Sequence, residues 1–356
     1  MRVETLRLKQ FRNVSALQLE FHPNLNFFFG KNGVGKTNLL EALFFLFEGK
    51  SFRTSEYKNL IHQGQEISIL EAKVTLKNGT QQINAKLLPH QKEFFKEGKK
   101  TNRAGMRHLL SILFAPEEIL VVKGSPQDRR QSVDNLLCHL SSKYFELLRD
   151  YKKILLQRNQ LLKNEELSTD SLRGQLSLWN ESLILKGTAL MEERRCWIAH
   201  WNRYILDRYR CIAGQNAEVE LSYRPHVSGE EWREKLEFYF ERERLQKTSL
   251  VGPHRDDFPP LIDGGEVRAF RSQGEARSFT LAMKLSEIDL FREIWGEDPI
   301  LLLDDVASEL DPERNEAFFS YLSNYGGQVF VTATSKHLVP LSQLSKNHIW
   351  EMPLNP

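Results

Sequence analysis

The chain contains few cysteines and no long apolar run. Its three cysteines, Cys138, Cys196 and Cys211, are too few and too far apart for a disulfide framework or a zinc site. No segment approaches the roughly 18 apolar residues of a membrane-spanning helix. Residues 1–13 carry charges where a signal peptide needs an apolar stretch. We therefore expect a soluble, cytoplasmic protein with no membrane partner.

The chain also has little net charge. It has 49 lysines and arginines and 47 aspartates and glutamates, which gives a formal charge of +2. This balance excludes a polyanionic or polycationic tail protein, and it falls short of the basic footprint of a dedicated nucleic-acid-binding domain. With 356 residues the chain has room for two or three domains, because a domain typically takes about 150 residues. It contains no internal repeat and no low-complexity segment.

The spacing of apolar side chains divides the chain into three stretches. Residues 25–29 predict a strand, and residues 37–47 predict a helix directly after it. Apolar side chains then recur every three or four residues over 133–154 and again over 176–204, which predicts an antiparallel helical hairpin. Strand-and-helix character returns near residue 251. We expect one α/β lobe that is interrupted in sequence by a mainly helical lobe.

Two shorter segments carry their own predictions. Asn78-Gly79 lies between two strand-like runs and predicts a β-hairpin. Residues 92–107 contain six lysines and arginines among few apolar residues, which predicts an exposed loop and the start of a helix. Together with Arg129 and Arg130, this segment is a candidate for contacts with DNA phosphates, and a solvated charged face is the alternative.

A phosphate-binding motif follows the first predicted strand. Residues 30–37 match G-x-x-x-x-G-K-[ST] at every fixed position, between a predicted strand and a predicted helix. Its glycines allow backbone N–H groups to surround phosphates, Lys36 neutralises their charge, and the Thr37 hydroxyl binds Mg²⁺. The predicted ATP-binding residues are Gly30, Lys31, Asn32, Gly33, Val34, Gly35, Lys36, Thr37 and Asn38.

An apolar strand that ends in two acids is the expected partner of this loop. Residues 299–303 are apolar and lead into Asp304-Asp305, as in a buried parallel strand whose end lies beside the phosphates. Asp304 is expected to hold Mg²⁺ with Thr37. Asp305 is expected to orient or deprotonate the attacking water, so Asp305 and Lys36 are the predicted catalytic residues.

A third motif lies between the other two. Ser272, Gln273, Gly274 and Glu275 open a predicted helix and resemble the signature motif of ABC ATPases. In that class the serine hydroxyl and glycine amide bind the γ-phosphate held by the other subunit, again at a helix N-terminus. Ser308 and Asp311 follow Asp305 as the D-loop does. Hydrolysis then requires two subunits around two ATP molecules, and we expect a C2 homodimer.

Several further segments make a family resemblance specific. With the three motifs above, they resemble the RecF family of bacterial DNA repair proteins, short relatives of the SMC and Rad50 ATPases. The phosphate loop is common to a whole superfamily, whereas the other segments are more particular. They are 8–13 (LKQFRN), 51–53 (SFR), 114–117 (FAPE), 123–130 (KGSPQDRR) and 252–257 (GPHRDD).

The resemblance implies both the fold and the biology. It implies an α/β ABC-type P-loop ATPase lobe like the heads of Rad50 and SMC, at 1–125 and 250–356, with a mainly helical insertion lobe at 126–249. ATP and Mg²⁺ are the expected cofactors of a weak, DNA-stimulated ATPase. ATP binding is expected to close a homodimer on duplex, gapped or junction DNA in recombinational repair, and slow hydrolysis to release it. A RecR-type mediator that helps to load recombinase is the expected partner.

The chain departs from related patterns at three positions. Glu275 replaces the glutamine of many RecF signatures, and Asp305 stands where transporters have a longer glutamate. The predicted last strand lacks the transporter histidine, for which Thr334 is the candidate substitute. For His254, Asp256 and Asp257 we expect a hydrogen-bond cluster near the lobe junction without a catalytic role.

Three other functions remain as alternatives. A transporter-type ABC subunit is disfavoured by the missing histidine and by the large insertion between phosphate loop and signature. A small-molecule P-loop kinase would need an arginine-rich lid and would have no use for the signature. A structural SMC-like tether would need a far longer coiled coil than the predicted hairpin.

Overall fold

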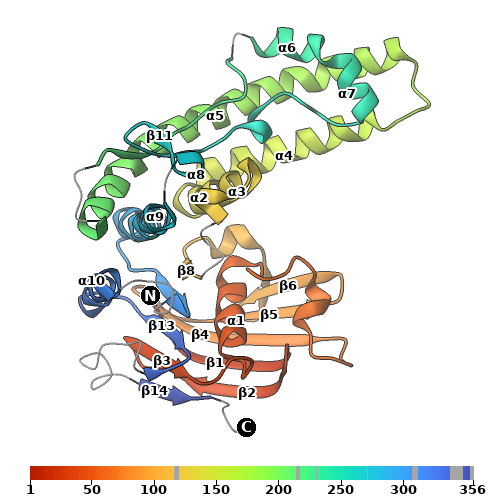
Figure 1. The fold of residues 1–356 in the computed structure, drawn as a ribbon. Helices are drawn as coiled ribbons and strands as arrows, with labels where there is room; N and C mark the ends of the chain where they lie inside the picture. The colour runs from red at the N-terminus through yellow and green to blue at the C-terminus, as the bar shows by residue number, and fades with distance from the viewer. Residues whose placement is uncertain are drawn as a thin grey trace. The chain divides into compact units, whose positions relative to one another are not determined.

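The computed structural model of the chain describes residues 1–115, 120–213, 217–229, 231–270, 272–306, 312–336 and 348–352. The chain divides into two compact units, Met1–Glu118 with Lys284–Pro356, and Ile119–Met283. The first unit contains two sheets and the second a long helical hairpin, which confirms the predicted α/β class (Figure 1). The lobe boundaries expected from the sequence stay a prediction.

A parallel five-stranded sheet forms the centre of the first unit. Its strand order is β14-β3-β13-β12-β8. Its strands are β3 (Leu25–Phe29), β8 (Ser111–Phe114), β12 (Ile300–Asp304), β13 (Val329–Ala333) and β14 (His348–Glu351). The first four are buried along their whole length, which explains why they read as continuous apolar runs.

The register of this sheet brings the ends of three strands together. Thr332 pairs with both Phe28 and Asp304, and Ala333 pairs with Phe29. The end of β3, which leads into the phosphate loop, therefore lies at the same sheet edge as the acids after β12. Ligands of open α/β sheets bind at this carboxyl edge.

A six-stranded antiparallel sheet forms the other layer of the first unit. Its order is β2-β1-β4-β5-β6-β7. The strands are β1 (Arg2–Phe11), β2 (Val14–Glu20), β4 (Ser68–Leu76), β5 (Gly79–Leu88), β6 (Gln91–Lys96) and β7 (Lys99–Thr101). Apolar side chains of helix α1 (Lys36–Glu48) share one core with residues of both sheets, so α1 is fixed from two sides.

The predicted hairpin at Asn78-Gly79 is confirmed. For residues 92–107 the predicted loop is wrong, although Lys99 and Lys100 are exposed and a short helix follows. That segment forms β6, β7 and the short 3-10 helix η2 (Arg103–Met106), because it continues the antiparallel meander by pairing with β5. The remaining elements of this unit are η1 (Tyr57–Leu60) and α10 (Pro312–Ser323).

The second unit is built on the predicted helical hairpin, which is confirmed, although Ser141 divides the first predicted stretch, 133–154, between two helices. Helices α4 (Ser142–Leu162) and α5 (Thr169–Ala213) run antiparallel, joined by ion pairs of Lys143 with Glu193 and of Asp150 with Lys186. The neighbouring helices are α2 (Leu120–Lys123), α3 (Pro126–Leu140), α6 (Trp232–Phe238), α7 (Phe240–Gln246), η4 (Pro253–Arg255) and α8 (Val267–Phe270).

A small antiparallel sheet and one long helix complete this unit. The sheet has the order β11-β10-β9, from β9 (Val219–Leu221), β10 (Pro260–Ile262) and β11 (Gly265–Glu266). Helix α9 (Gln273–Trp295) contains the boundary between the two units. Within the described ranges, no helix has the length and hydropathy needed to cross a bilayer.

Candidate functional site

The phosphate loop is a turn between β3 and α1 that requires glycine at two positions. Gly33 and Gly35 have φ angles of 85° and 102°, values that a residue with a Cβ adopts only under strain. No atom lies within 4 Å of the place where a Gly33 Cβ would stand, so this side of the loop is open. At Gly30 a Cβ would come within 2.9 Å of the Met352 carbonyl oxygen. The loop is thus supported at its start and open where phosphates would enter.

Lys36 is held inside this loop. Its Nζ donates to the carbonyl oxygens of Gly30 at 2.6 Å and Lys31 at 2.9 Å, and only 7% of the residue is exposed. Burial lowers the pKa of the Lys36 ammonium, while the negative charges of Asp305 and Asp304 act to raise it. A phosphate oxygen in the loop would supply the negative partner that this buried cation requires, so the residues fit ATP.

A hydroxyl and a carboxylate meet directly below the loop. The Thr37 Oγ1 donates to Asp304 Oδ1 at 3.0 Å, and the Thr332 Oγ1 donates to the same oxygen at 2.7 Å. Asp304 is 8% exposed. Mg²⁺ prefers such oxygen ligands, and the pairing of Thr37 with Asp304 joins the two residues predicted to hold it. The donor set therefore fits Mg²⁺.

Thr332 is a site residue that the motifs did not reveal. It lies on β13, opposite Asp304 in the parallel register, and bonds to both Asp304 and Asp305. The Asp305 backbone N–H donates to the Thr332 oxygens, at 3.2 Å to the carbonyl and 3.1 Å to Oγ1. The sequence feature that could have indicated Thr332 is its place near the end of a buried apolar strand that follows the acid-ending strand.

Asp305 adopts an unusual backbone conformation. Its φ is 52°, in the left-handed region where aspartate and asparagine are among the few side-chain-bearing residues tolerated. The residue is half-buried, whereas Asp304 before it is buried. The two neighbouring acids therefore differ in exposure. This difference is consistent with the predicted roles, Mg²⁺ binding for Asp304 and activation of water for Asp305.

The signature segment forms the N-terminal cap of α9 in the second unit. The Ser272 N–H and Oγ both donate to Glu275 Oε2 at 2.9 Å, and the Glu275 N–H donates back to Ser272 Oγ at 3.2 Å. This reciprocal capping box explains why a glutamate suits position 275. Ser308 and Asp311, the predicted D-loop residues, lie outside the described residues, as do Pro116, Glu117 and Arg271.

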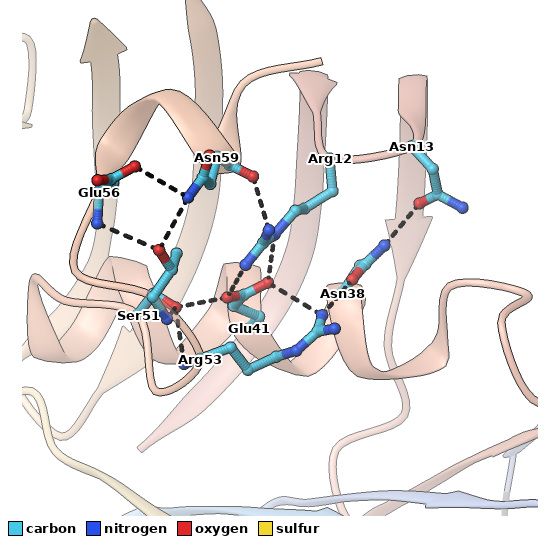
Figure 2. Close-up of polar contacts among 9 residues, drawn as sticks. Arg12, Asn13, Asn38, Glu41, Ser51, Arg53, Glu56 and Asn59 are labelled. Carbon is cyan, nitrogen blue, oxygen red and sulfur yellow. Dashed lines mark hydrogen bonds and ion pairs between the residues drawn. The ribbon is translucent and has the colours of Figure 1, made fainter. Parts of the chain in front are cut away.

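A polar cluster that received no role from the sequence surrounds Glu41 of α1. Glu41 is fully buried and accepts a bidentate pair from Arg12, at 2.8 Å from Nε and 2.6 Å from Nη2 (Figure 2). It also accepts the Ser51 hydroxyl at 2.5 Å, and the Arg53 guanidinium lies 3.6 Å away. Arg12 has a φ of 53° and donates to the Asn59 carbonyl at 2.6 Å, so Glu41 fixes a strained turn.

The same cluster reaches the first turn of α1. Arg53 donates to Asn38 Oδ1 at 2.9 Å, and the Asn38 amide donates to Asn13 Oδ1 at 2.7 Å (Figure 2). Asn13 lies against Gly35, whose Cβ would stand 3.4 Å from the Asn13 amide atoms. Two segments of the family resemblance, LKQFRN and SFR, therefore converge on the phosphate-loop helix.

Replacing Glu41 with alanine should lower the free energy of unfolding by about 3–5 kcal/mol, because the Arg12 charge would remain largely buried without its carboxylate. The Arg12 side chain is 18% exposed and that of Glu41 is 0% exposed. Chemical denaturation measures the change. The matched control is Glu71→Ala, which removes an exposed 3.7 Å pair with Arg7 and should change stability by less than about 1 kcal/mol. Equal losses in the two variants would contradict the role given to Glu41.

Two basic residues of the segment 92–107 have partners within the protein. Lys92 bonds to the Gly49 carbonyl and lies over the Tyr57 ring at 5.1 Å. Lys100 pairs with Glu93 at 2.6 Å. Lys92 faces inward and Lys100 is neutralised, whereas Lys99 is exposed, so contacts between the segment 92–107 and DNA phosphates stay a prediction.

The arginines of the KGSPQDRR segment also have partners inside the protein. Arg129 makes a bidentate pair with Asp257 at 2.7 and 2.8 Å, and Arg130 donates to the Asp256 carbonyl at 2.5 Å. These contacts bury Arg129 and leave Arg130 half-buried. The two arginines are therefore held by contacts within the second unit, and their contact with DNA stays a prediction.

The GPHRDD segment forms a buried network, in agreement with the hydrogen-bond role expected for it. Burial lowers the pKa of His254 to about 3, so its imidazole is neutral at physiological pH. Its ring bonds the Tyr151 hydroxyl at 2.7 Å and the Ser249 carbonyl at 3.1 Å. The predicted position near a lobe junction is not tested, since these contacts all lie within the second unit.

Comparison with known proteins gives full-length relatives. The family model described as the RecF/RecN/SMC N terminal domain matches residues 2–347. The DNA replication and repair protein RecF of Lachnoclostridium phytofermentans is 34% identical and covers 99% of this chain and 98% of that protein. The protein of the same name from Moorella thermoacetica is 35% identical, over 98% of this chain and 94% of that protein.

Solved structures agree with these relatives. The recombination mediator protein RecF of the RecFOR pathway, solved with ATP, matches with a TM-score of 0.87 at 30% identity, over 95% of this chain and 93% of that one. The SMC head domain of Pyrococcus furiosus matches with a TM-score of 0.53 at 14% identity, over 95% and 90% of the two chains, and shows the fold alone. The chain therefore has the ABC-type head fold and belongs to the RecF family of the RecF/RecN/SMC group.

Proposed function

We propose that this chain is an ATP-dependent DNA-binding protein of recombinational repair. The observation that carries the proposal is the meeting of Lys36, Thr37 and Asp304 at one sheet edge, in a chain whose full-length relatives are named DNA replication and repair proteins. The structures of relatives solved with nucleotide support ATP as the ligand of this edge. The cytoplasm is the proposed location.

Within this proposal, each residue of the sheet edge has a role. Residues 30–38 bind the phosphates, and Lys36 exchanges its two carbonyl partners for phosphate oxygens. Thr37 and Asp304 hold Mg²⁺, which when bound neutralises charge on the phosphates. Thr332 keeps the Asp304 carboxylate in place, and Asp305 orients the attacking water and accepts its proton. ATP hydrolysis is the proposed activity, and its acceleration by DNA is part of the proposal.

The dimer is proposed from the signature segment. Ser272, Gln273, Gly274 and Glu275 form a helix cap whose hydroxyl and N–H groups suit an anion. We assign this cap to the γ-phosphate held by the other subunit, with the D-loop residues Ser308 and Asp311 beside it. Two such contacts close a C2 homodimer around two ATP molecules.

DNA and a RecR-type mediator are the proposed partners. A chain with a formal charge of +2 binds DNA phosphates weakly as a monomer, and a dimer doubles the basic surface that it offers. Because ATP controls dimerisation in this proposal, ATP also controls the binding of DNA. Gapped or junction DNA is the proposed target, and slow hydrolysis releases it.

The test compares DNA affinity with and without nucleotide. Fluorescence anisotropy with linear, gapped and single-stranded DNA, in the presence of ATP, ADP or neither, should give at least about tenfold tighter binding with ATP than without. The ATPase rate should rise with the same DNA that binds best. Equal affinity in all three nucleotide states would refute the ATP switch, and DNA-independent turnover would favour a transporter-type subunit or a kinase.

A further inference from the structure

A buried network of ion pairs and hydrogen bonds in the second unit joins the helical hairpin to the segment that leads to the signature. Asp256 is fully buried and accepts hydrogen bonds from Arg194 Nη1 at 2.8 Å, the Tyr223 hydroxyl at 2.7 Å and the His226 N–H at 2.8 Å. Arg194 also pairs with Asp134 of α3 at 2.8 Å. Arg194 of α5 thereby joins two carboxylates, Asp134 of α3 and Asp256, and Asp256 also holds the chain after β9.

The charges of this network cancel. Arg129, Arg130 and Arg194 face Asp134, Asp256 and Asp257, so no net charge is left among these side chains. A buried cluster of charges is stable only when it is paired and hydrogen-bonded in this way. Removal of one member therefore disturbs the whole arrangement instead of one contact.

Arg129 connects the network to the signature helix. Besides its bidentate pair with Asp257, it donates from Nη1 to the Gly124 carbonyl at 2.9 Å. The same carbonyl accepts a hydrogen bond from Arg268 of α8 at 3.4 Å. Helix α8 ends at Phe270, two residues before Ser272, so Gly124 links the Arg129 pair to the chain that enters the signature cap.

The backbone between Asp257 and α8 has little freedom. Asp257 and Arg224 exchange two backbone hydrogen bonds, of 2.9 and 3.0 Å, and β10 then pairs with both β9 and β11. Phe258 and Val267 are fully buried at the two ends of this stretch. Displacement of Asp257 should therefore move α8, which ends two residues before Ser272.

From this we propose that Arg129 and Asp257 are positioning residues that set the place of the Ser272–Glu275 cap for the nucleotide of the other subunit. This role deepens the proposed function and rests on its ATP-closed dimer. Neither residue touches nucleotide. Their loss acts on dimer closure and not on the binding of ATP to a single subunit, because the phosphate loop belongs to the other compact unit.

The first experiment compares two properties of the Asp257→Asn variant. Its affinity for a fluorescent ATP analogue should stay within about twofold of the wild type, and its ATP-dependent dimer, measured by analytical ultracentrifugation, should be weakened at least about tenfold. Asp257→Glu keeps the carboxylate and should restore part of the dimer. Arg268 is exposed, so the Arg268→Ala variant should fold like the wild type. It should nevertheless form a weaker ATP-dependent dimer, as Asp257→Asn does.

The matched control is Glu243→Gln. Glu243 and Arg158 form another buried ion pair of this unit, at 2.5 Å, with side chains 0% and 1% exposed. This variant should lose thermal stability, as Asp257→Asn does, and yet dimerise with ATP like the wild type. If both variants lose the dimer equally, the Arg129–Asp257 pair is only structural and the inference is wrong.

An experiment that mixes two variants distinguishes a role in positioning the cap from general damage to the fold. A Lys36→Ala subunit keeps an intact cap, and an Asp257→Asn subunit keeps an intact phosphate loop, so a mixed dimer contains one complete site. Its ATPase rate should exceed that of either variant alone. If the wild type dimerises with ATP but mixing does not raise the ATPase rate, the inference is wrong while the proposed function stands. A wild type that forms no ATP-dependent dimer overturns the proposed function instead.

Discussion

Replacing Lys36 with alanine is expected to weaken ATP binding at least about 100-fold, a loss of about 2.7 kcal/mol. The Lys36 Nζ is the cation at the centre of the loop, and Asp304 and Asp305 act on it electrostatically. Without it, two carboxylates face the entering phosphates with no lysine charge between them. The ATP-stimulated retention of DNA should disappear with the nucleotide.

Titration calorimetry with ATP and Mg²⁺ measures this loss, and thermal unfolding checks that the variant is folded. Lys58→Ala is the matched control, because Lys58 lies on η1 with 61% of its side chain exposed and pairs only at the surface with Glu56. The control should bind ATP like the wild type. A Lys36→Ala protein that keeps its ATP affinity would mean that the loop does not bind phosphates as proposed.

Replacing Asp305 with asparagine is expected to reduce the rate of ATP hydrolysis at least about 100-fold, the lower range of general-base effects. Asparagine has the shape of aspartate and tolerates the same left-handed backbone, so the φ of 52° and the backbone bonds to Thr332 should persist. The amide cannot accept a proton from water. ATP affinity should therefore change by less than about threefold, and the ATP-bound dimer should accumulate.

Size-exclusion chromatography after incubation with ATP shows whether the dimer is trapped, and a phosphate-release assay gives the rate. Asp298→Asn is the control, because Asp298 belongs to the same unit and pairs with Arg292 at 2.6 Å without reaching the sheet edge. It should turn over ATP at the wild-type rate. Wild-type turnover by Asp305→Asn would show that another group activates the water.

The motifs were sufficient for the parts of the site that depend on local sequence. Residues 30–37 and the acids after β12 could be placed together from their patterns alone, because buried parallel strands end at one edge of a sheet. The helical hairpin also followed from spacing, since its buried face repeats with the period of a helix.

The error at residues 92–107 has a physical cause. Lys99 and Lys100 in β7 are exposed, whereas Lys92 in β6 is half-buried, with its ammonium bonded to the Gly49 carbonyl and over the Phe45 and Tyr57 rings. A sequence window counts such a lysine as exposed. Only the pairing of β6 with β5 decides which lysines face the core.

By itself, then, the sequence determined the phosphate loop, the acid-ending strand and the helix cap, because each depends on residues close together in the chain. The α/β class and the family resemblance followed from the order of such segments along the chain. The tertiary structure decided what joins them. Thr332 meets Asp304 across 28 residues, Arg12 meets Glu41 across 29, and Arg129 meets Asp257 across 128. Such contacts depend on strand register and helix packing, and no local pattern of side chains specifies them.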